Sequence, residues 1–421
     1  MHRLSVIGCA AGFIAVVALF YVLQDRIEET PPPNPDGSAV VQEWMGLMLS
    51  LTEESFGFTP PVAARAFGYA GVSLYESVRF SIPGAPTLAG QLNGFEPDMM
   101  RSIDASGTYD WNLVANANLS AMARVLYPNA LPRERARIDA LERALFVRYA
   151  EGVDERVAAD SVVLGLAVAD VVARYAASDG RAKAHAANFP RSYVPPVGDG
   201  LWVPTPRGLK NAMQPSWGET RPFLVANVTE TLPPPPPAYS NEPDSTFVRE
   251  VREVYDTVEN LSADQLATAQ FWSDEPMKTA TPAGHSVSIL RQVLDKEDAS
   301  LATGAIAFAK LGIALHDSFI ACWRAKFVYN MIRPITAIRM RIDAEFTIPL
   351  DTPPFPEYPS GHSVQSAAAA EVLTSLFGED YAFVDETHRG RTDMGVDTRT
   401  FRSFREFAEE AFSVAGLNWK D

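Results

Sequence analysis

Two basic residues near position 330 could together bind an oxyanion. Lys326 and Arg333 are seven residues apart, which is two turns of a helix, so both cations are predicted to project from one face. Pro334 would then end that helix. Burying two like charges side by side is unfavourable unless an anion lies between them, and a tetrahedral oxyanion suits that need. Two surface cations with carboxylate partners are the alternative.

A Ser-Gly-His sequence follows the two cations and precedes an apolar segment, residues 363–377, that predicts a helix. The start of a helix offers free backbone amides and the positive end of the helix dipole. Ser360 could cap the helix and donate its hydroxyl, and Gly361 would let an anion approach its amide. His362 could protonate a leaving oxygen. Such a sequence alone is more often an ordinary cap, but its place after two cations favours an anion site.

Other polar residues give weaker signals for chemistry. His388 and Arg389 lie in a polar segment, where a solvated loop is the default and a substituted nucleophile is the alternative. His285 is predicted to line the rim of a pocket or to precede a helix. His316 and Asp317 lie on the same predicted helix as the first cation, and structural roles are expected for both.

The pattern of apolar residues along the chain predicts an all-α protein, organised as two stacked helical bundles. Hydrophobic residues make up 47% of the 421 residues, which is enough to fill such cores. No strand pattern of any length competes with the helical one. The predicted organisation is a signal anchor or signal peptide at 1–24, a proline-rich linker at 25–39, an N-terminal helical bundle at 40–187, a proline-rich irregular wall at 188–244 and a C-terminal helical domain at 245–421.

The N-terminal run from Leu4 to Leu23 contains no charged residue and is long enough to cross a membrane. No small-x-small cleavage site stands at its end, so an uncleaved anchor is predicted, with a removed signal peptide as the alternative. Both interpretations place the globular part in the periplasm or outside the cell.

Charge and cysteine content exclude other classes. A net charge of −16 argues against a nucleic-acid partner, because there is no excess of cations to displace phosphate counterions. The chain has 2 cysteines, one of them in the N-terminal apolar run, so neither an intramolecular disulfide framework nor a cysteine metal site is expected. No residue is predicted to bind a metal directly.

The motif Lys-x6-Arg-Pro followed by Pro-Ser-Gly-His resembles the first two of three motifs shared by vanadium-dependent haloperoxidases and type 2 phosphatidic acid phosphatases. The resemblance implies that Lys326, Arg333, Ser360 and Gly361 hold the oxygens of vanadate or phosphate and that His362 is the acid/base. It also implies vanadate as cofactor, with hydrogen peroxide and a halide, or else a phosphomonoester, as substrates. Further segments resemble the bacterial haloperoxidase-related branch, at residues 88–93, 202–223, 270–272, 281–285 and 321–326.

The third motif of these families contains an arginine and a histidine, the latter bonding to vanadium or attacking phosphorus. It is expected shortly after residues 401–411, yet no arginine or histidine follows Arg405. This pattern suggests a truncated or frame-shifted product with weakened vanadate binding, unless a partner in a homo-oligomer supplies the missing helix. The favoured function is an impaired vanadium haloperoxidase, and the alternatives are an acid phosphatase and an inactive oxyanion-binding remnant.

Overall fold

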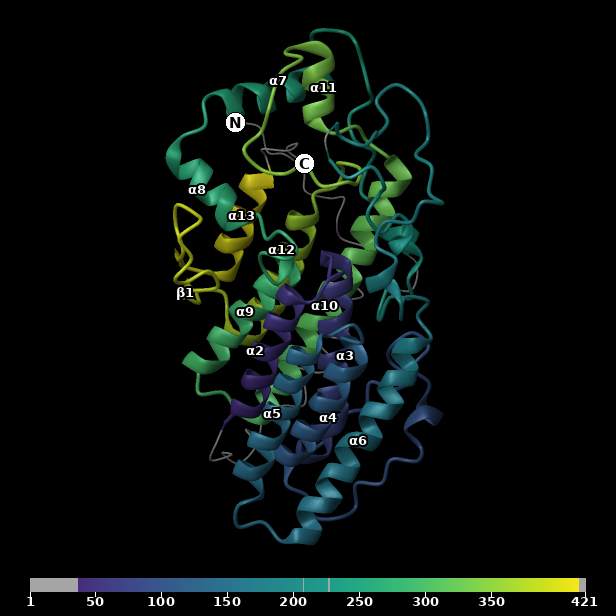
Figure 1. The fold of residues 1–421 in the computed structure, drawn as a ribbon, viewed down its shortest axis with the longest axis vertical. Coiled ribbons are helices and arrows are strands. Elements are labelled where there is room, and N and C mark those ends of the chain that lie inside the picture. The colour runs from purple at the N-terminus through teal and green to yellow at the C-terminus, as the bar shows by residue number, and fades with distance from the viewer. Residues whose placement is uncertain (1–36, 207, 226–227, 416–421) are drawn as a thin grey trace.

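The computed structural model describes residues 37–206, 208–225 and 228–415, which form a mostly helical protein (Figure 1). The all-α class predicted from the sequence is confirmed. The N-terminal part of the described chain forms helices α2 (Ala39–Glu54), α3 (Pro60–Val78), α4 (Trp111–Leu126), α5 (Pro132–Ala150) and α6 (Glu155–Ala177). The rest forms α7 (Thr246–Glu259), α8 (Ala263–Phe271), α9 (Thr281–Lys296), α10 (Leu301–Tyr329), α11 (Pro334–Arg341), α12 (Gly361–Phe377) and α13 (Phe404–Ala415).

Helix α10 is the central element, and it packs against α2, α3, α9 and α12 (Figure 1). Glycines allow α3 and α10 to cross closely. A Cβ on Gly71 of α3 would lie 2.6 Å from the Phe308 carbonyl oxygen, and a Cβ on Gly312 of α10 would lie 2.7 Å from the Phe67 carbonyl oxygen. Any larger residue at these positions would push the two backbones apart.

Helix α10 is long and apolar enough to cross a membrane by length and composition, but 78% of its most apolar window is buried inside the protein. Helix α10 is therefore the core helix of the fold. The predicted membrane anchor at residues 4–23 and nearly all of the linker at residues 25–39 lie outside the described residues.

An irregular, proline-rich segment at residues 188–244 covers one side of α10 and is tied to it by hydrogen bonds. The Asp317 carboxylate accepts the backbone N–H of Phe223 at 2.7 Å and those of the next two residues at 2.8 and 3.2 Å. The Trp202 amide donates to the carbonyl of Asn330, directly after α10, at 2.7 Å. Both aromatic side chains are fully buried, so this segment is part of the core.

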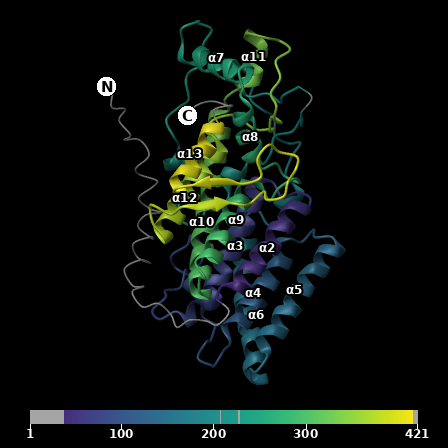
Figure 2. The same cartoon turned by 90° about the vertical axis from the view of Figure 1, so that its left-hand side faces the viewer.

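Two short strands, β1 (Phe383–Asp385) and β2 (Arg399–Phe401), form an antiparallel hairpin that packs against α9 and α13 (Figure 2). Phe383 pairs with Phe401 in its register. The apolar pattern of the sequence predicted no strands, and in this region that prediction was wrong. Strands of three residues are too short to produce a recognisable alternation of apolar and polar side chains.

Candidate functional site

The two cations predicted to share one helix lie on either side of a helix end. Lys326 is in the last turn of α10, which ends at Tyr329 because Asn330 adopts a left-handed conformation with φ of 49°. Pro334 is the first residue of α11, where its fixed φ favours a helix start. Arg333 therefore precedes α11, and the prediction that one helix carries both cations and ends at Pro334 was wrong.

Lys326 and Arg333 nevertheless converge on the segment that precedes α12, and both are buried. The Lys326 ammonium donates to the carbonyl oxygens of Pro356 at 3.1 Å and Glu357 at 2.6 Å. The Arg333 guanidinium donates to the Phe355 carbonyl at 2.7 Å and to the Glu357 carboxylate at 2.5 Å. The Phe355 ring centre lies 4.9 Å from the ammonium nitrogen and 4.6 Å from the guanidinium carbon. One aromatic ring thus contacts both cations.

The start of α12 has the cap predicted from the sequence. The Ser360 hydroxyl accepts the backbone N–H of Ser363 at 3.2 Å. A Cβ on Gly361 would lie 3.8 Å from the Trp323 ring of α10, which is an ordinary van der Waals distance, so this position is not tightly packed. The Ser363 hydroxyl is buried and has no hydrogen-bond partner among the described residues. The first amides of a helix have no partner within the helix, and together with an unpartnered hydroxyl they are donors that an anion site requires.

His362 lies at this helix start, where one of its ring nitrogens makes a hydrogen bond and the other has no partner among the described residues. The Trp272 carbonyl accepts a hydrogen bond from the ring, while the buried Nε2 has no partner within the described ranges. Nδ1 is therefore the donor to the carbonyl. Burial lowers the pKa of His362, the nearby positive charges of Lys326 and His285 lower it further, and Asp274 opposes them. A neutral His362 in this tautomer offers a lone pair on Nε2 as a proton acceptor.

The structure thus brings the five predicted site residues to one place, between the end of α10, the segment after it and the start of α12. Their roles in binding and catalysis remain a prediction. The predicted residues are Lys326, Arg333, Ser360, Gly361 and His362.

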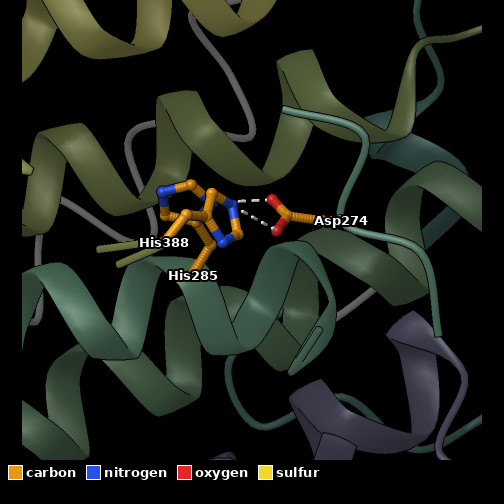
Figure 3. A group of neighbouring side chains, drawn as sticks. All are labelled: Asp274, His285 and His388. Atoms are coloured by element: carbon orange, nitrogen blue, oxygen red, sulfur yellow. Dashed lines mark hydrogen bonds and ion pairs between the residues drawn. The ribbon is translucent and has the colours of Figure 1, made fainter. Parts of the chain in front are cut away.

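A buried group of acidic and imidazole side chains, which the sequence did not predict, lies next to this site (Figure 3). The His285 Nδ1 lies 2.7 Å from the Asp274 carboxylate, and its Nε2 lies 2.7 Å from the Asp385 carboxylate. The His388 Nε2 lies 2.9 Å from the Phe271 carbonyl oxygen and 3.4 Å from Asp274. Burial alone would lower the pKa of His285, but the two carboxylates raise it to about 10.

Two predictions about these histidines were wrong. His285 lies inside α9 and is 2% exposed, so it is neither at a rim nor before a helix. His388 is 3% exposed, although a solvated loop was expected, while Arg389 beside it is exposed and pairs with Glu386. The group joins residues from the turn after α8, from α9 and from the hairpin. No local spacing connects such segments, so no sequence signal could have found the group.

His316 and Asp317 have structural contacts. His316 is buried on α10, where its ring packs 4.8 Å from the Phe223 ring and 5.9 Å from that of Tyr69. Burial lowers the pKa of His316 to about 4. Burial raises the pKa of Asp317 to about 6, although the amides that it binds oppose this shift. Both residues attach the irregular segment to α10.

Asp274, His285 and His388 each offer one possible metal-ligand atom, and these atoms lie within 4.8 Å of one another. Both nitrogens of His285 are already at hydrogen-bond distance from carboxylates, and a metal between two ligands would hold them farther apart. The His388 Nε2 faces a carbonyl oxygen, which can only accept a proton. These distances indicate that hydrogen bonds, and not a metal ion, connect the imidazole rings to the carboxylate and carbonyl oxygens.

Comparison with solved structures decides the family. A bacterial vanadium-dependent iodoperoxidase is 32% identical to this chain, with a TM-score of 0.81 over 92% of each chain. The chain belongs to the vanadium haloperoxidase family. The family model described as VCPO second helical-bundle domain matches residues 306–417, which include α10 from residue 306 onward, α11, α12 and α13. A search among curated protein sequences gave no match.

More distant haloperoxidases share the fold. The holo form of a bacterial vanadium-dependent chloroperoxidase is 15% identical, with a TM-score of 0.54 over 96% of this chain and 92% of its own. The apo form of such a chloroperoxidase is 16% identical, with a TM-score of 0.55 over 95% of this chain and 92% of its own.

The site of this haloperoxidase family member has donors that fit a vanadate ion. Two unpartnered buried polar atoms, on His362 and Ser363, lie at this helix start, and Gly361 beside them is not tightly packed. Arg333 directs three N–H groups at protein oxygens, and a guanidinium has about five in all, so about two are left for a ligand. The Glu357 carboxylate competes with an anion for this arginine.

Proposed function

We propose that this protein binds vanadate at the start of α12 and oxidises a halide with hydrogen peroxide. The observation that carries the proposal is the convergence of Lys326 and Arg333 on the segment before α12, beside the unpartnered His362 Nε2. Two buried cations and a helix N-terminus supply the positive potential that a multiply charged oxyanion requires. Membership of the vanadium haloperoxidase family supports vanadate as that oxyanion.

Each predicted residue has a definite task in this proposal. Lys326 and Arg333 neutralise the charge on the oxygens of the anion, and the amides after Ser360 donate hydrogen bonds to them. His362 exchanges a proton through Nε2, because its Nδ1 is bound to the Trp272 carbonyl. Vanadate, when bound, supplies the activation of hydrogen peroxide toward the halide.

The first experiment measures vanadate binding to the full chain by calorimetry. Lys326→Met is expected to weaken binding by about 10-fold or more, because it removes one charge-assisted contact. Lys310→Met is the matched control, since Lys310 lies on the same helix more than four turns away. Equal loss of binding in both variants, or no loss in either, would refute the proposed site.

A second experiment separates the two enzymatic alternatives. Oxidation of iodide and bromide by hydrogen peroxide is followed with and without added vanadate, and hydrolysis of a chromogenic phosphomonoester is followed in parallel. Vanadate-dependent halide oxidation supports the haloperoxidase. Phosphomonoester hydrolysis that vanadate inhibits, without halide oxidation, supports an acid phosphatase instead. Neither activity, together with measurable vanadate binding, supports an inactive oxyanion-binding protein.

A further inference from the structure

The turn between α8 and α9 connects the buried group around His285 to the oxyanion site. The carbonyl of Trp272 in this turn accepts the hydrogen bond from the ring of His362. The indole ring of Trp272 stacks on the imidazole of His285, with ring centres 4.7 Å apart and an angle of 17° between the planes. One residue therefore contacts both histidines, through its backbone on one side and its side chain on the other.

His285 holds this turn through a carboxylate on each side of its ring. Asp274, two residues after Trp272, binds Nδ1, and Asp385 of the hairpin binds Nε2, both at 2.7 Å. All three charged side chains are at most 2% exposed. Two carboxylates buried together would repel each other, and the imidazolium between them removes that repulsion. A protonated His285 thus neutralises the carboxylate of the turn and that of the hairpin together.

The backbone at Asp274 shows that the turn needs to be held. Asp274 has a φ of 42°, in the left-handed region, which costs a residue other than glycine about 1 kcal/mol or more. Aspartate tolerates this conformation better than most residues, but it is stable only when surrounding contacts maintain it. The hydrogen bond from the His285 Nδ1 to the Asp274 side chain is such a contact.

We propose that His285, fixed between Asp274 and Asp385, is a positioning residue for His362. It holds the turn so that the Trp272 carbonyl fixes the proton of His362 on Nδ1 and leaves Nε2 directed at the anion. This assignment deepens the proposed function, on which it rests, because it explains how a residue remote from the anion sets the tautomer of the acid/base.

The test reads the His362 tautomer directly. The chain has 6 histidines, so selective labelling of histidine with nitrogen-15 gives a simple NMR spectrum, and His362→Gln identifies the signals of His362. Nitrogen-15 shifts distinguish a ring protonated on Nδ1 from one protonated on Nε2. In the wild type the Nδ1–H form is expected. In His285→Gln a mixture with the Nε2–H form is expected, together with a loss of vanadate affinity of about 10-fold to 100-fold.

His316→Gln is the matched control, because His316 is also a buried histidine on a core helix but has no contact with the Asp274 group. It should leave the His362 signals unchanged. If His285→Gln does not fold, Asp385→Asn replaces it, since the asparagine oxygen still accepts from the His285 Nε2 while the charge is lost. That variant is expected to shift the tautomer in the same direction.

Two outcomes overturn the assignment. A folded His285→Gln protein whose His362 remains in the Nδ1–H form shows that His285 is not required, and an Nε2–H form in the wild type shows that the carbonyl does not set the tautomer. Failure of the proposed function is a separate result. If the wild type binds no vanadate but His285→Gln still shifts the tautomer, the positioning role stands and the function does not.

Discussion

The stability of this protein is expected to depend on a proton at His285 as the pH rises above neutrality. Burial alone would lower the pKa of His285, but Asp274 and Asp385 raise it from 6.5 to about 10. Between these two values the folded protein keeps a proton that the unfolded chain has lost. The folded state then binds more protons, so the free energy of unfolding falls as the pH rises. The stabilisation from this proton is fully present below the pKa of the unfolded histidine. It is lost as the pH rises through the pKa of His285 in the folded protein.

The magnitude over one pH unit follows from this one proton. A difference of one full proton changes the free energy of unfolding by about 1.4 kcal/mol per pH unit. Between about pH 7 and about pH 8 the unfolded histidine still holds part of its proton, so the free energy of unfolding falls by about 1.2 kcal/mol over this interval. Lys310 acts in the opposite direction, because burial lowers its pKa to about 8. Its contribution over the same interval is smaller, at about 0.4 kcal/mol.

A variant without the charges of the group isolates the effect. His285→Gln combined with Asp385→Asn removes the cation and one carboxylate together, which avoids leaving two unpaired buried carboxylates. The contributions of Lys310 and the other histidines cancel between this variant and the wild type. Between about pH 7 and about pH 8, the free energy of unfolding of the wild type should fall by about 1.2 kcal/mol more than that of the variant.

The assay is urea unfolding of the full chain, followed by tryptophan fluorescence at the two pH values, with the midpoint and slope fitted for each. His316→Gln serves as the control and should keep the wild-type pH dependence to within about 0.2 kcal/mol. The folded pKa of about 4 keeps His316 neutral over this interval, and the same histidine in the unfolded chain has lost most of its proton by pH 7. An equal fall in the free energy of unfolding of the double variant and the wild type between the two pH values would refute this account of His285. A rise in the wild-type value relative to the variant would refute it as well.

Three further substitutions test packing and charge at the centre of the protein, each with urea unfolding as the readout. Gly71→Ala should lower the free energy of unfolding by about 2 kcal/mol, because its Cβ would lie 2.6 Å from the Phe308 carbonyl oxygen. An unchanged unfolding midpoint would contradict the close crossing of α3 and α10. Gly361→Ala should leave stability within about 0.5 kcal/mol, since its nearest neighbour is at 3.8 Å, yet weaken vanadate binding in calorimetry. Glu357→Gln should cost about 3 kcal/mol by leaving Arg333 buried without its carboxylate, and a stabilised protein would argue against that ion pair.

Local patterns in the sequence were sufficient for the helical class and for much of the oxyanion site. The apolar segment at residues 363–377 was predicted as a helix, and α12 spans Gly361–Phe377, because the run of apolar residues that favours a helix depends only on neighbours in the chain. The cap at Ser360 is equally local, since it involves the residue three positions later. The clustering of basic residues before it was also visible without a structure.

Tertiary structure alone decided which side chains meet across distant segments. The sequence placed Lys326 and Arg333 on one helix face, whereas they meet through the Phe355 ring on either side of a helix end set by a left-handed Asn330. Whether an asparagine ends a helix depends on the contacts around it, which periodicity does not contain.

The group around His285 shows the same limit more clearly. Asp274 is 11 residues from His285, and Asp385 is 100 residues away, yet both carboxylates bind the one imidazole ring. A charged residue in a polar segment is expected to be solvated unless a specific partner is buried with it. Only the packing of the hairpin against α9 supplies that partner, so the fold determines the protonation of His285 and, through the Trp272 turn, the orientation of His362.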